Sequence, residues 1–390
     1  MPELYFCCHP WDVLEDGLEE TLVRLAGEIG VDSLSVPAIH GRIEQLRPRY
    51  QRPWIRREAA ATFQPSSPHY GNTRIRPIPG AWMKTRNVFE QLTRACEKHR
   101  IAMRARVACC NGETTAARFR MATCVDVFGE SSLTRLCPSN PDVREYVHGL
   151  IADLTENYEP ASIELEGLDF GVGPFDSAEC ARGIAWGRTA HFLRSLCFCA
   201  ACRQRASDAG VDADSVAHTV RDRLNCLFEL GSIGFATPEA LVEDNRELRS
   251  WTHMRRESVL SLLRSIRERS RSRLLTRYGG DALIRGAGPA DLLEYCDALV
   301  CPPPADHDAS HGRGSRSSTG DFGDPRRIDV QVYCHPPHMP DGPTLVRTVQ
   351  KLSQAGHPSI GFSSYGLAPK PCLDWVRQAI RYTRRESTEA

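Results

Sequence analysis

The chain has 390 residues, too many for one small module and enough for two domains or for one large α/β barrel. Hydrophobic residues make up 41% and charged residues 25%, which supplies a core and a polar surface and excludes wholesale disorder. The 49 Lys and Arg residues balance the 49 Asp and Glu residues, so no general basic field predicts nucleic acid or an anionic membrane as a partner.

Targeting and membrane signals are missing from the sequence. No run approaches the roughly 18 continuous apolar residues of a membrane span. The first residues read Met-Pro-Glu-Leu-Tyr-Phe-Cys-Cys-His, which begins like a strand and has no basic region before an apolar core. We therefore expect a cytoplasmic protein, whose 16 cysteines serve as thiols or metal ligands and not as a disulfide framework.

Strand-like and helix-like runs alternate along the whole chain. The predicted strands are residues 3–9, 32–40, 101–109, 162–170, 273–278, 298–301, 328–334 and 359–364. The predicted helices include residues 18–29, 88–99, 142–158, 344–354 and 373–381. Eight such units predict the α/β class and a single (β/α)8 TIM barrel over residues 1–390. A doubly wound open sheet uses the same units, but no Gly-rich dinucleotide fingerprint follows an early strand, which favours the barrel.

Three segments depart from this alternation. Residues 42–82 form a long loop after strand two, rich in Arg, Pro and aromatic residues, which suits either a lid or surface decoration. Residues 171–271 are predicted to be a helical insertion after strand four, and this insertion contains a cysteine cluster. Residues 302–327 have the composition of a disordered loop after strand six.

The cysteine cluster is the most specific signal in the sequence. Cys197, Cys199 and Cys202 stand in Cys-Phe-Cys-Ala-Ala-Cys, a spacing that one ion can collect. A closed tetrahedral zinc site needs a fourth thiolate, for which Cys137 and Cys180 are the candidates. Four thiolates leave no open position, so the zinc would be structural; the alternative is a group of ordinary buried thiols.

These motifs resemble those of the zinc-containing bacterial β-galactosidases and related glycosyl-hydrolase-like barrels. That family carries a Cys-x-Cys-x-x-Cys turn after strand four and a further Cys in a Cys-Pro-x-Ser/Asn-Pro-x-x-Arg stretch upstream. Here that stretch is Cys137 to Arg144, and the likeness extends over residues 130–205. It implies a (β/α)8 barrel, a structural zinc on Cys137 and the three clustered cysteines, and a carbohydrate substrate. The family often forms oligomers, so a homo-oligomer is implied as well.

Strand four carries two acidic residues on one face. Because side chains alternate along a strand, Glu164 and Glu166 point one way while Ile163 and Leu165 point the other. The apolar face of a barrel strand meets the helices, so both Glu residues point inward, with Glu166 nearer the C-terminal mouth. We take Glu166 as the first catalytic candidate, followed by Glu164 and by Asp169, just past the strand.

A structural role for these acids is the alternative. Arg104 and Arg106 share a face of strand three, so an inward ladder between them and Glu164 would satisfy both charges. A Glu held against Arg has a lowered pKa and would act as nucleophile or base, not as proton donor.

Two departures from the resembling family concern its catalytic carboxylates. In the family the strand-four Glu is the acid/base and follows an Asn, whereas Leu165 precedes Glu166 here. The family's nucleophile is a Glu on strand seven, and residues 329–335 contain none. Glycosidases need two carboxyls, roughly 5–5.5 Å apart for retention or roughly 6.5–9.5 Å for inversion. The second carboxyl would come from Asp169, Asp281 or Asp306.

Polar and aromatic residues follow several predicted strands. Because the C-terminal ends of barrel strands meet at one mouth, these residues could contact a sugar by stacking and hydrogen bonds. The predicted substrate-binding residues are His9, Trp11, His40, Arg106, Asn111, Tyr333, His335 and Tyr365.

Three functions fit the sequence. The first is a glycoside hydrolase that acts through the strand-four carboxylates. The second, favoured by the missing strand-seven Glu, is a diverged barrel that binds carbohydrate or serves a biosynthetic pathway. The third is a metal-dependent isomerase or lyase, with His9, His40 and His335 holding a metal together with Glu166.

Overall fold

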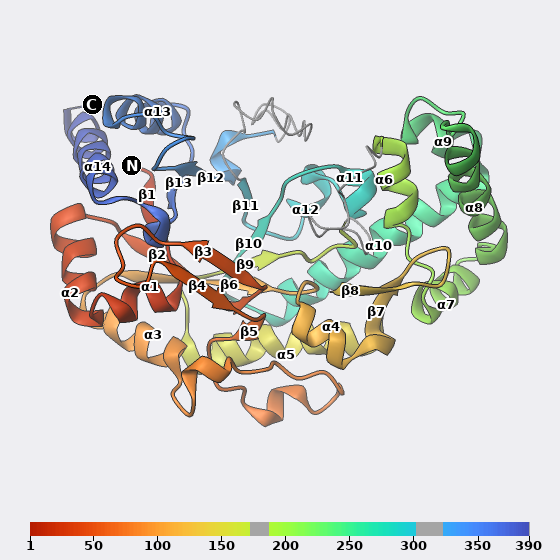
Figure 1. Ribbon diagram of the computed structural model, residues 1–390, viewed down its shortest axis with the longest axis horizontal. Helices are drawn as coiled ribbons and strands as arrows, with labels where there is room; N and C mark the ends of the chain where they lie inside the picture. The colour runs from red at the N-terminus through yellow and green to blue at the C-terminus, as the bar shows by residue number, and fades with distance from the viewer. Residues whose placement is uncertain (172–186, 302–322, 390) are drawn as a thin grey trace.

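Eight parallel strands form a closed ring in the computed structural model, which describes residues 1–171, 187–301 and 323–389 (Figure 1). The strands follow one another around the ring in chain order, and β1 pairs with both β2 and β13 to close it. They are β1 Glu3–Cys7, β2 Ser33–His40, β6 Ala102–Ala108, β9 Ser162–Glu166, β10 Arg273–Arg277, β11 Ala298–Cys301, β12 Ile328–Tyr333 and β13 Ser359–Ser363. Each lies within a predicted strand, so the (β/α)8 barrel is confirmed and the open sheet is excluded.

Helices surround the ring. They are α1 Pro10–Glu15, α2 Leu18–Val23, α3 Val88–Lys98, α4 Glu113–Arg118, α5 Pro141–Tyr158, α6 Arg188–Ser195, α7 Ala200–Asp208, α8 Ala213–Leu230, α9 Pro238–Asp244, α10 Arg246–Arg269, α11 Ala282–Arg285, α12 Pro289–Leu292, α13 Gly342–Gln354 and α14 Lys370–Glu389. The predicted helix at 18–29 is α2 followed by a π-helix, Arg24–Ile29. Within the described ranges, no helix has both the length and the apolar character needed to cross a membrane.

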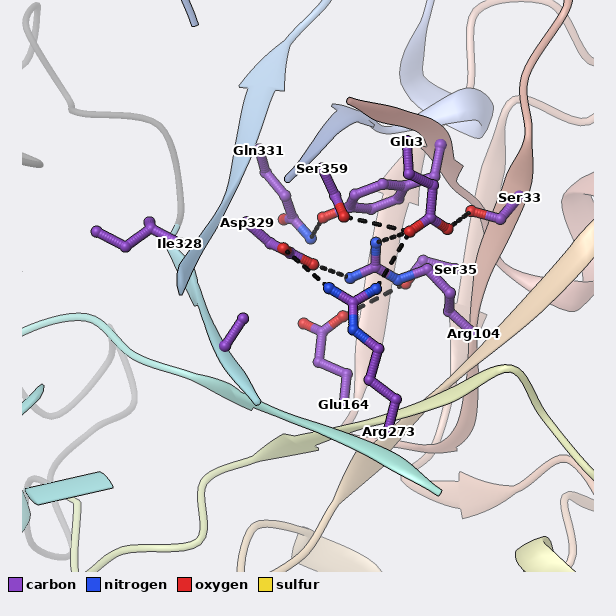
Figure 2. A network of polar contacts seen from close by, with 12 residues as sticks. Glu3, Ser33, Ser35, Arg104, Glu164, Arg273, Ile328, Asp329, Gln331 and Ser359 are labelled. Atoms are coloured by element: carbon purple, nitrogen blue, oxygen red, sulfur yellow. Dashed lines mark hydrogen bonds and ion pairs between the residues drawn. The ribbon is translucent and has the colours of Figure 1, made fainter. Parts of the chain in front are cut away.

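The N-terminal end of the ring is filled by charged side chains. Arg104 Nη2 lies 2.6 Å from Asp329 Oδ2, and Arg273 Nη1 lies 3.3 Å from Glu3 Oε2. Figure 2 shows both guanidinium groups between the two carboxylates. These residues point into the ring because they occupy alternate positions near the strand starts. Two positive charges therefore balance two negative charges there, and the opposite, C-terminal end is left for a site.

The middle of the ring contains a tyrosine and a small apolar cluster. Tyr5 lies with its ring 3.9 Å from the Arg104 guanidinium, and its hydroxyl accepts a hydrogen bond from Gln331 Nε2. A Cβ on the facing Gly361 would lie 2.3 Å from the Tyr5 ring, so only glycine leaves room for it. Leu275, Ala298 and Val300 form an apolar cluster separate from the main core between strands and helices.

The irregular segments are more ordered than the sequence suggests. Inside the long loop at 42–82, β3 Ile43–Leu46 and β4 Trp54–Arg57 form an antiparallel hairpin, and β5 Ala60–Ala61 pairs with β2. Another hairpin, β7 Thr123–Val125 with β8 Ser131–Leu136, precedes α5.

Helices α6 to α10 account for much of the predicted insertion, and α7, α8 and α9 form a lobe at one end of the molecule (Figure 1). Residues 172–186 of that insertion lie outside the described residues, as do residues 302–322 of the segment predicted to be disordered. The end of that segment is helical, because Pro325–Arg327 forms a 3₁₀ turn.

Candidate functional site

Glu164 and Glu166 both point into the ring, and one arginine joins them. Arg277 Nε, at the end of β10, lies 2.9 Å from Glu164 Oε1 and 2.8 Å from Glu166 Oε1. The Glu164 side chain is 0% exposed, whereas that of Glu166 is 26% exposed. Glu166 is therefore the carboxylate nearer the mouth, and Glu164 is an internal partner of Arg277.

Glu166 lies between two cations. Arg106 Nη1 is 3.7 Å from Glu166 Oε1, on the side opposite Arg277 in strand order. Burial alone would raise the pKa of the Glu166 carboxyl, but the charges of Arg277 and Arg106 outweigh burial and lower this pKa below its ordinary value. At neutral pH the group is an anion, suited to act as nucleophile or base. The predicted ladder from Arg104 and Arg106 to Glu164 is not formed. Arg104 pairs with Asp329 and Arg106 with Glu166, while Arg277 is the partner of Glu164.

Two histidines and two tryptophans pack together beside the mouth. Trp11 stacks on His9 at 4.7 Å between ring centroids and meets His40 edge-on at 5.2 Å. Trp82, from the long loop, meets Trp11 edge-on at 5.6 Å, and the Arg57 guanidinium lies over both indoles. Three predicted substrate-binding residues, His9, Trp11 and His40, are therefore brought together.

The two histidines differ in their surroundings. Burial lowers the pKa of His40 to about 4, so its imidazole is neutral at neutral pH. Its Nε2 is buried and has no hydrogen-bond partner among the described residues. His9 Nδ1 lies 3.7 Å from Asp12 Oδ2, so this histidine has a carboxylate beside it, whereas His40 has none in the part of the chain that the structure describes.

The other predicted substrate-binding residues lie in different surroundings from one another. Tyr333, at the end of β12, stacks on His338 at 4.2 Å, and His335 lies two residues further with its Nδ1 2.9 Å from the Pro336 carbonyl oxygen. Tyr365 is fully buried on the helix-facing side of β1, where its ring packs against Phe6 and its hydroxyl donates to Asp16.

Asp169 and Asn111 lie close to the end of β9. Asp169 is held by two arginines, with Arg135 Nη1 at 3.4 Å and Arg285 Nη1 at 2.7 Å from its carboxylate oxygens. Asn111 is exposed and makes a β-bridge to Arg135. This ion triad occupies both oxygens of Asp169.

The other two candidates for a second carboxyl lie elsewhere. Asp281 caps α11, accepts a hydrogen bond from the backbone N–H of Leu283 and pairs with Arg188. Asp306 lies outside the described residues.

Four cysteines converge at the other candidate site. The sulfur atoms of Cys137, Cys197, Cys199 and Cys202 all lie within 4.8 Å of one another, and all four residues are buried. Cys137 Sγ is 3.5 Å from Cys202 Sγ and 3.8 Å from Cys197 Sγ. A tetrahedral zinc with Zn–S bonds of about 2.3 Å separates its sulfurs by about 3.8 Å. The cluster could therefore hold a metal ion with little rearrangement. Cys180, the alternative fourth ligand, lies outside the described residues.

Local structure explains how these cysteines meet. Asn140 and Pro141 begin α5 and fix the turn that carries Cys137, while Cys199 is the N-cap residue of α7 and Cys202 lies in its first turn. The backbone N–H of Val125 points at Cys197 Sγ at 3.4 Å, the kind of donor that supports a thiolate ligand.

A buried cation and a further thiol lie beside the cluster. The guanidinium of Arg255, which is 1% exposed, lies near enough to interact electrostatically with the thiolates of Cys197 and Cys202. Cys124, on β7, is a fifth buried thiol that interacts with Cys137 and Cys197 and was not part of the predicted ligand set.

A histidine metal site is not formed. The described residues bring no three of His9, His40, His335 and Glu166 within metal-ligand distance of a common point, while the cysteine cluster does meet that criterion. The geometry therefore gives no support to the metal-dependent isomerase or lyase.

The fold of this chain is similar to that of several enzymes of known structure. No model of a known protein family and no curated sequence matches the chain. The catalytic domain of a β-amylase from Paenibacillus polymyxa has 10% identity and a TM-score of 0.58, over 97% of this chain and 98% of that domain. A β-galactosidase from the psychrophilic Marinomonas ef1 has 9% identity and a TM-score of 0.55, over 100% of this chain and 60% of the enzyme. The chain therefore shares the (β/α)8 barrel fold of these enzymes.

Two of the proteins with a similar fold are much longer than this chain. An α-L-fucosidase, isoenzyme 2 from Paenibacillus thiaminolyticus, has 11% identity and a TM-score of 0.53, over 100% of this chain and 50% of the enzyme. The chain thus spans about half the length of that fucosidase and 60% of the β-galactosidase. At such identities the likeness shows the fold alone.

Several residues of this site were not among those predicted from the sequence. Arg277 could have been predicted to point inward. Arg273, Leu275 and Arg277 occupy every second position of β10 and so share one face, as the two Glu residues do on β9. Trp82 and Arg57 could not, because they reach the mouth from a long loop whose path has no periodic signature.

Proposed function

We propose that this barrel acts on a glycosidic bond at its C-terminal mouth, with Glu166 as nucleophile or as base. The observation that carries the proposal is Glu166 itself, which is inward, partly exposed and held as an anion between Arg277 and Arg106. An anion in this place could attack the anomeric carbon or activate a water molecule.

The proton for the leaving group needs a different source. Glu166 keeps its charge, and Asp169 is bound by two arginines, so neither is a good acid. We assign the proton transfer to His9, because an imidazole can carry a proton near neutral pH and because His9 follows the end of β1 beside the mouth, next to the Asp12 carboxylate. Trp82, which is half-buried, would give the sugar an apolar wall, with the fully buried Trp11 supporting it from behind.

Hydrolysis of a panel of aryl glycosides tests this function. Glu166→Gln keeps the shape of the side chain but removes its charge, so we expect the rate to fall by about a hundredfold or more. Glu229→Gln, on the exposed face of α8, is the matched control and should cleave at the wild-type rate. An unchanged rate in Glu166→Gln would remove Glu166 from the reaction.

Carbohydrate binding without hydrolysis is the second candidate. It is favoured by β12, which ends in Tyr333 and brings no carboxylate to the mouth where the resembling family has its nucleophile. Wild-type protein that binds sugars but cleaves none of the aryl glycosides would select this candidate.

We also propose that the ion in the cysteine cluster is zinc, held by Cys137, Cys197, Cys199 and Cys202. Four thiolates in tetrahedral reach are the usual ligands of a structural zinc, and they leave no coordination position for a substrate. The ion would supply no chemistry at the mouth, and its contribution would be to stability.

A further inference from the structure

The hairpin after β2 is strongly basic in a chain that has no net charge. Residues 42–57, which span β3 and β4, contain six arginines and one acidic residue, Glu44, whereas the whole chain has a net charge of zero. The hairpin follows the C-terminal end of a barrel strand, so it belongs to the mouth side of the molecule. Charge of one sign concentrated at that side points to a ligand of the opposite sign.

An open cleft of about 830 Å³ lies between this hairpin and α1. Its acidic lining residues are already neutralised, because Glu15 lies 2.6 Å from Arg47 Nη2 and Asp16 lies 3.7 Å from Arg49 Nη1. Arg56, on the cleft rim, pairs with Glu44 at 2.9 Å.

Two further arginines line the cleft without an acidic partner. Neither Arg52 nor Arg57 has a carboxylate within 4.0 Å among the described residues. The Nε of Arg57 is buried and makes no hydrogen bond within the described part of the chain. Trp54, between them in sequence, lines the same cleft and is 61% exposed. Two guanidinium groups without a carboxylate partner, in a cleft that also carries an exposed indole, are suited to a ligand with both an anionic group and a flat apolar face.

The cleft lies next to the residues beside the mouth. The Arg57 guanidinium, on the cleft lining, lies 5.8 Å from the Trp11 ring centroid, and Trp11 stacks on His9. A saccharide of two or more units bound in the cleft would therefore have the mouth beside it.

We infer that this cleft binds an anionic sugar unit, through its carboxylate or sulfate group, within a longer saccharide that reaches Glu166. Arg52 and Arg57 would bind the anionic group, since a guanidinium matches both carboxylate and sulfate oxygens, and Trp54 would stack on a sugar ring. This inference rests on the proposed function, because it names the substrate class of the same mouth.

Binding measurements on the full chain carrying Glu166→Gln test the inference without requiring hydrolysis. Isothermal titration calorimetry would compare three hexasaccharides: one of galacturonic acid, one of sulfated galactose and one of neutral galactose. We expect one or both anionic hexasaccharides to bind, with an affinity that falls as salt is added, and the neutral one to bind more than about tenfold more weakly.

Substitutions of the residues that line the cleft test whether the ligand binds there. Arg52→Gln with Arg57→Gln should weaken the anionic ligand by more than about tenfold, because each removes a charge-assisted contact. Trp54→Ala should weaken it several-fold, while Arg326→Gln, which changes a surface pair with Asp324, should leave it unchanged. Circular dichroism would verify that each variant is folded.

Each outcome decides the inference. Binding of the uronate alone assigns the carboxylate, and binding of the sulfated sugar alone assigns the sulfate. Equal binding of the neutral hexasaccharide, no binding of any of the three, or unchanged binding in the double arginine variant would each overturn the inference. Cleavage of neutral aryl glycosides alongside such a result would leave the proposed function standing, so the two failures can be told apart.

Discussion

Glu164 and Glu166 show how one neighbouring residue, Arg277, affects two carboxylates on the same strand. Both stand on the same face of β9, yet Glu164 is fully enclosed and Glu166 is partly open to solvent. Arg277 binds both, so one positive charge lies between the two carboxylates inside the ring. Glu164 is thereby a positioning residue for Arg277, and Glu166 is the one carboxylate of this pair that a substrate could touch.

The lowered pKa of Glu166 predicts a dependence of stability on pH. A carboxyl whose pKa is lower in the folded state favours folding above its unfolded pKa, here about 4.5, and loses that contribution as the pH falls through the folded value. The difference in unfolding free energy between wild type and Glu166→Gln should therefore be largest at neutral pH and shrink below about pH 4.5. Urea unfolding at a series of pH values measures it; a difference that grows on acidification would contradict the charge state.

Short elements from distant parts of the chain meet at the cysteine cluster. Cys137 follows β8, Cys197 follows α6, and Cys199 and Cys202 belong to the start of α7. These segments also pack into the main hydrophobic core, where Phe198 stacks on Trp251 of α10. A shared ion would add its own contribution to the free energy of folding at this junction.

Removing one ligand should release the ion and loosen this part of the chain. We expect Cys199→Ser to contain no stoichiometric metal and to unfold at a lower temperature, because a structural zinc contributes on the order of 10 kcal/mol in small domains. Elemental analysis and calorimetry measure the two effects. Cys226→Ser, half-buried on α8, is the control, and Cys124→Ser should keep the metal. Full stability of metal-free Cys199→Ser would show that the thiols are ordinary core residues.

At the scale of the molecule, closure of the ring depends on what fits inside it. Its lumen holds the charge-balanced layer of Glu3, Arg104, Arg273 and Asp329, and above it the Tyr5 ring, which occupies the space that a side chain on Gly361 would need. The strands β1 and β13 that carry Tyr5 and Gly361 are neighbours, and β1 also pairs with β2.

Gly361→Ala should therefore destabilise the whole barrel. The added Cβ would meet the rigid Tyr5 ring at 2.3 Å, and overpacking of this kind costs about 1–3 kcal/mol of unfolding free energy. Adding Tyr5→Leu should recover part of the loss, because the smaller side chain vacates the space. Chemical unfolding measures both variants. Gly27→Ala, where nothing lies within 4 Å, is the control; a loss equal to that of Gly361→Ala would disprove the packing argument.

The pattern of apolar and polar residues was sufficient to predict the barrel and part of the site. Alternation on β9 predicted two inward carboxylates, and short cysteine spacings predicted the cluster, because both signals lie within a few residues of one another. The same pattern did not predict α1, which is only six residues long, or the β3–β4 hairpin, whose sequence carries many Arg and Pro residues and little periodicity.

Local sequence determined the eight strands, their inward faces and three of the four clustered cysteines, because each is a matter of period or spacing along the backbone. Only the folded molecule decided that Arg277 binds both Glu164 and Glu166, that Asp169 is held by two arginines, and that Trp82 and Arg57 meet Trp11. Those outcomes depend on which strands become neighbours and how long loops return, and residues far apart in the chain acquire a mutual distance only when the ring closes.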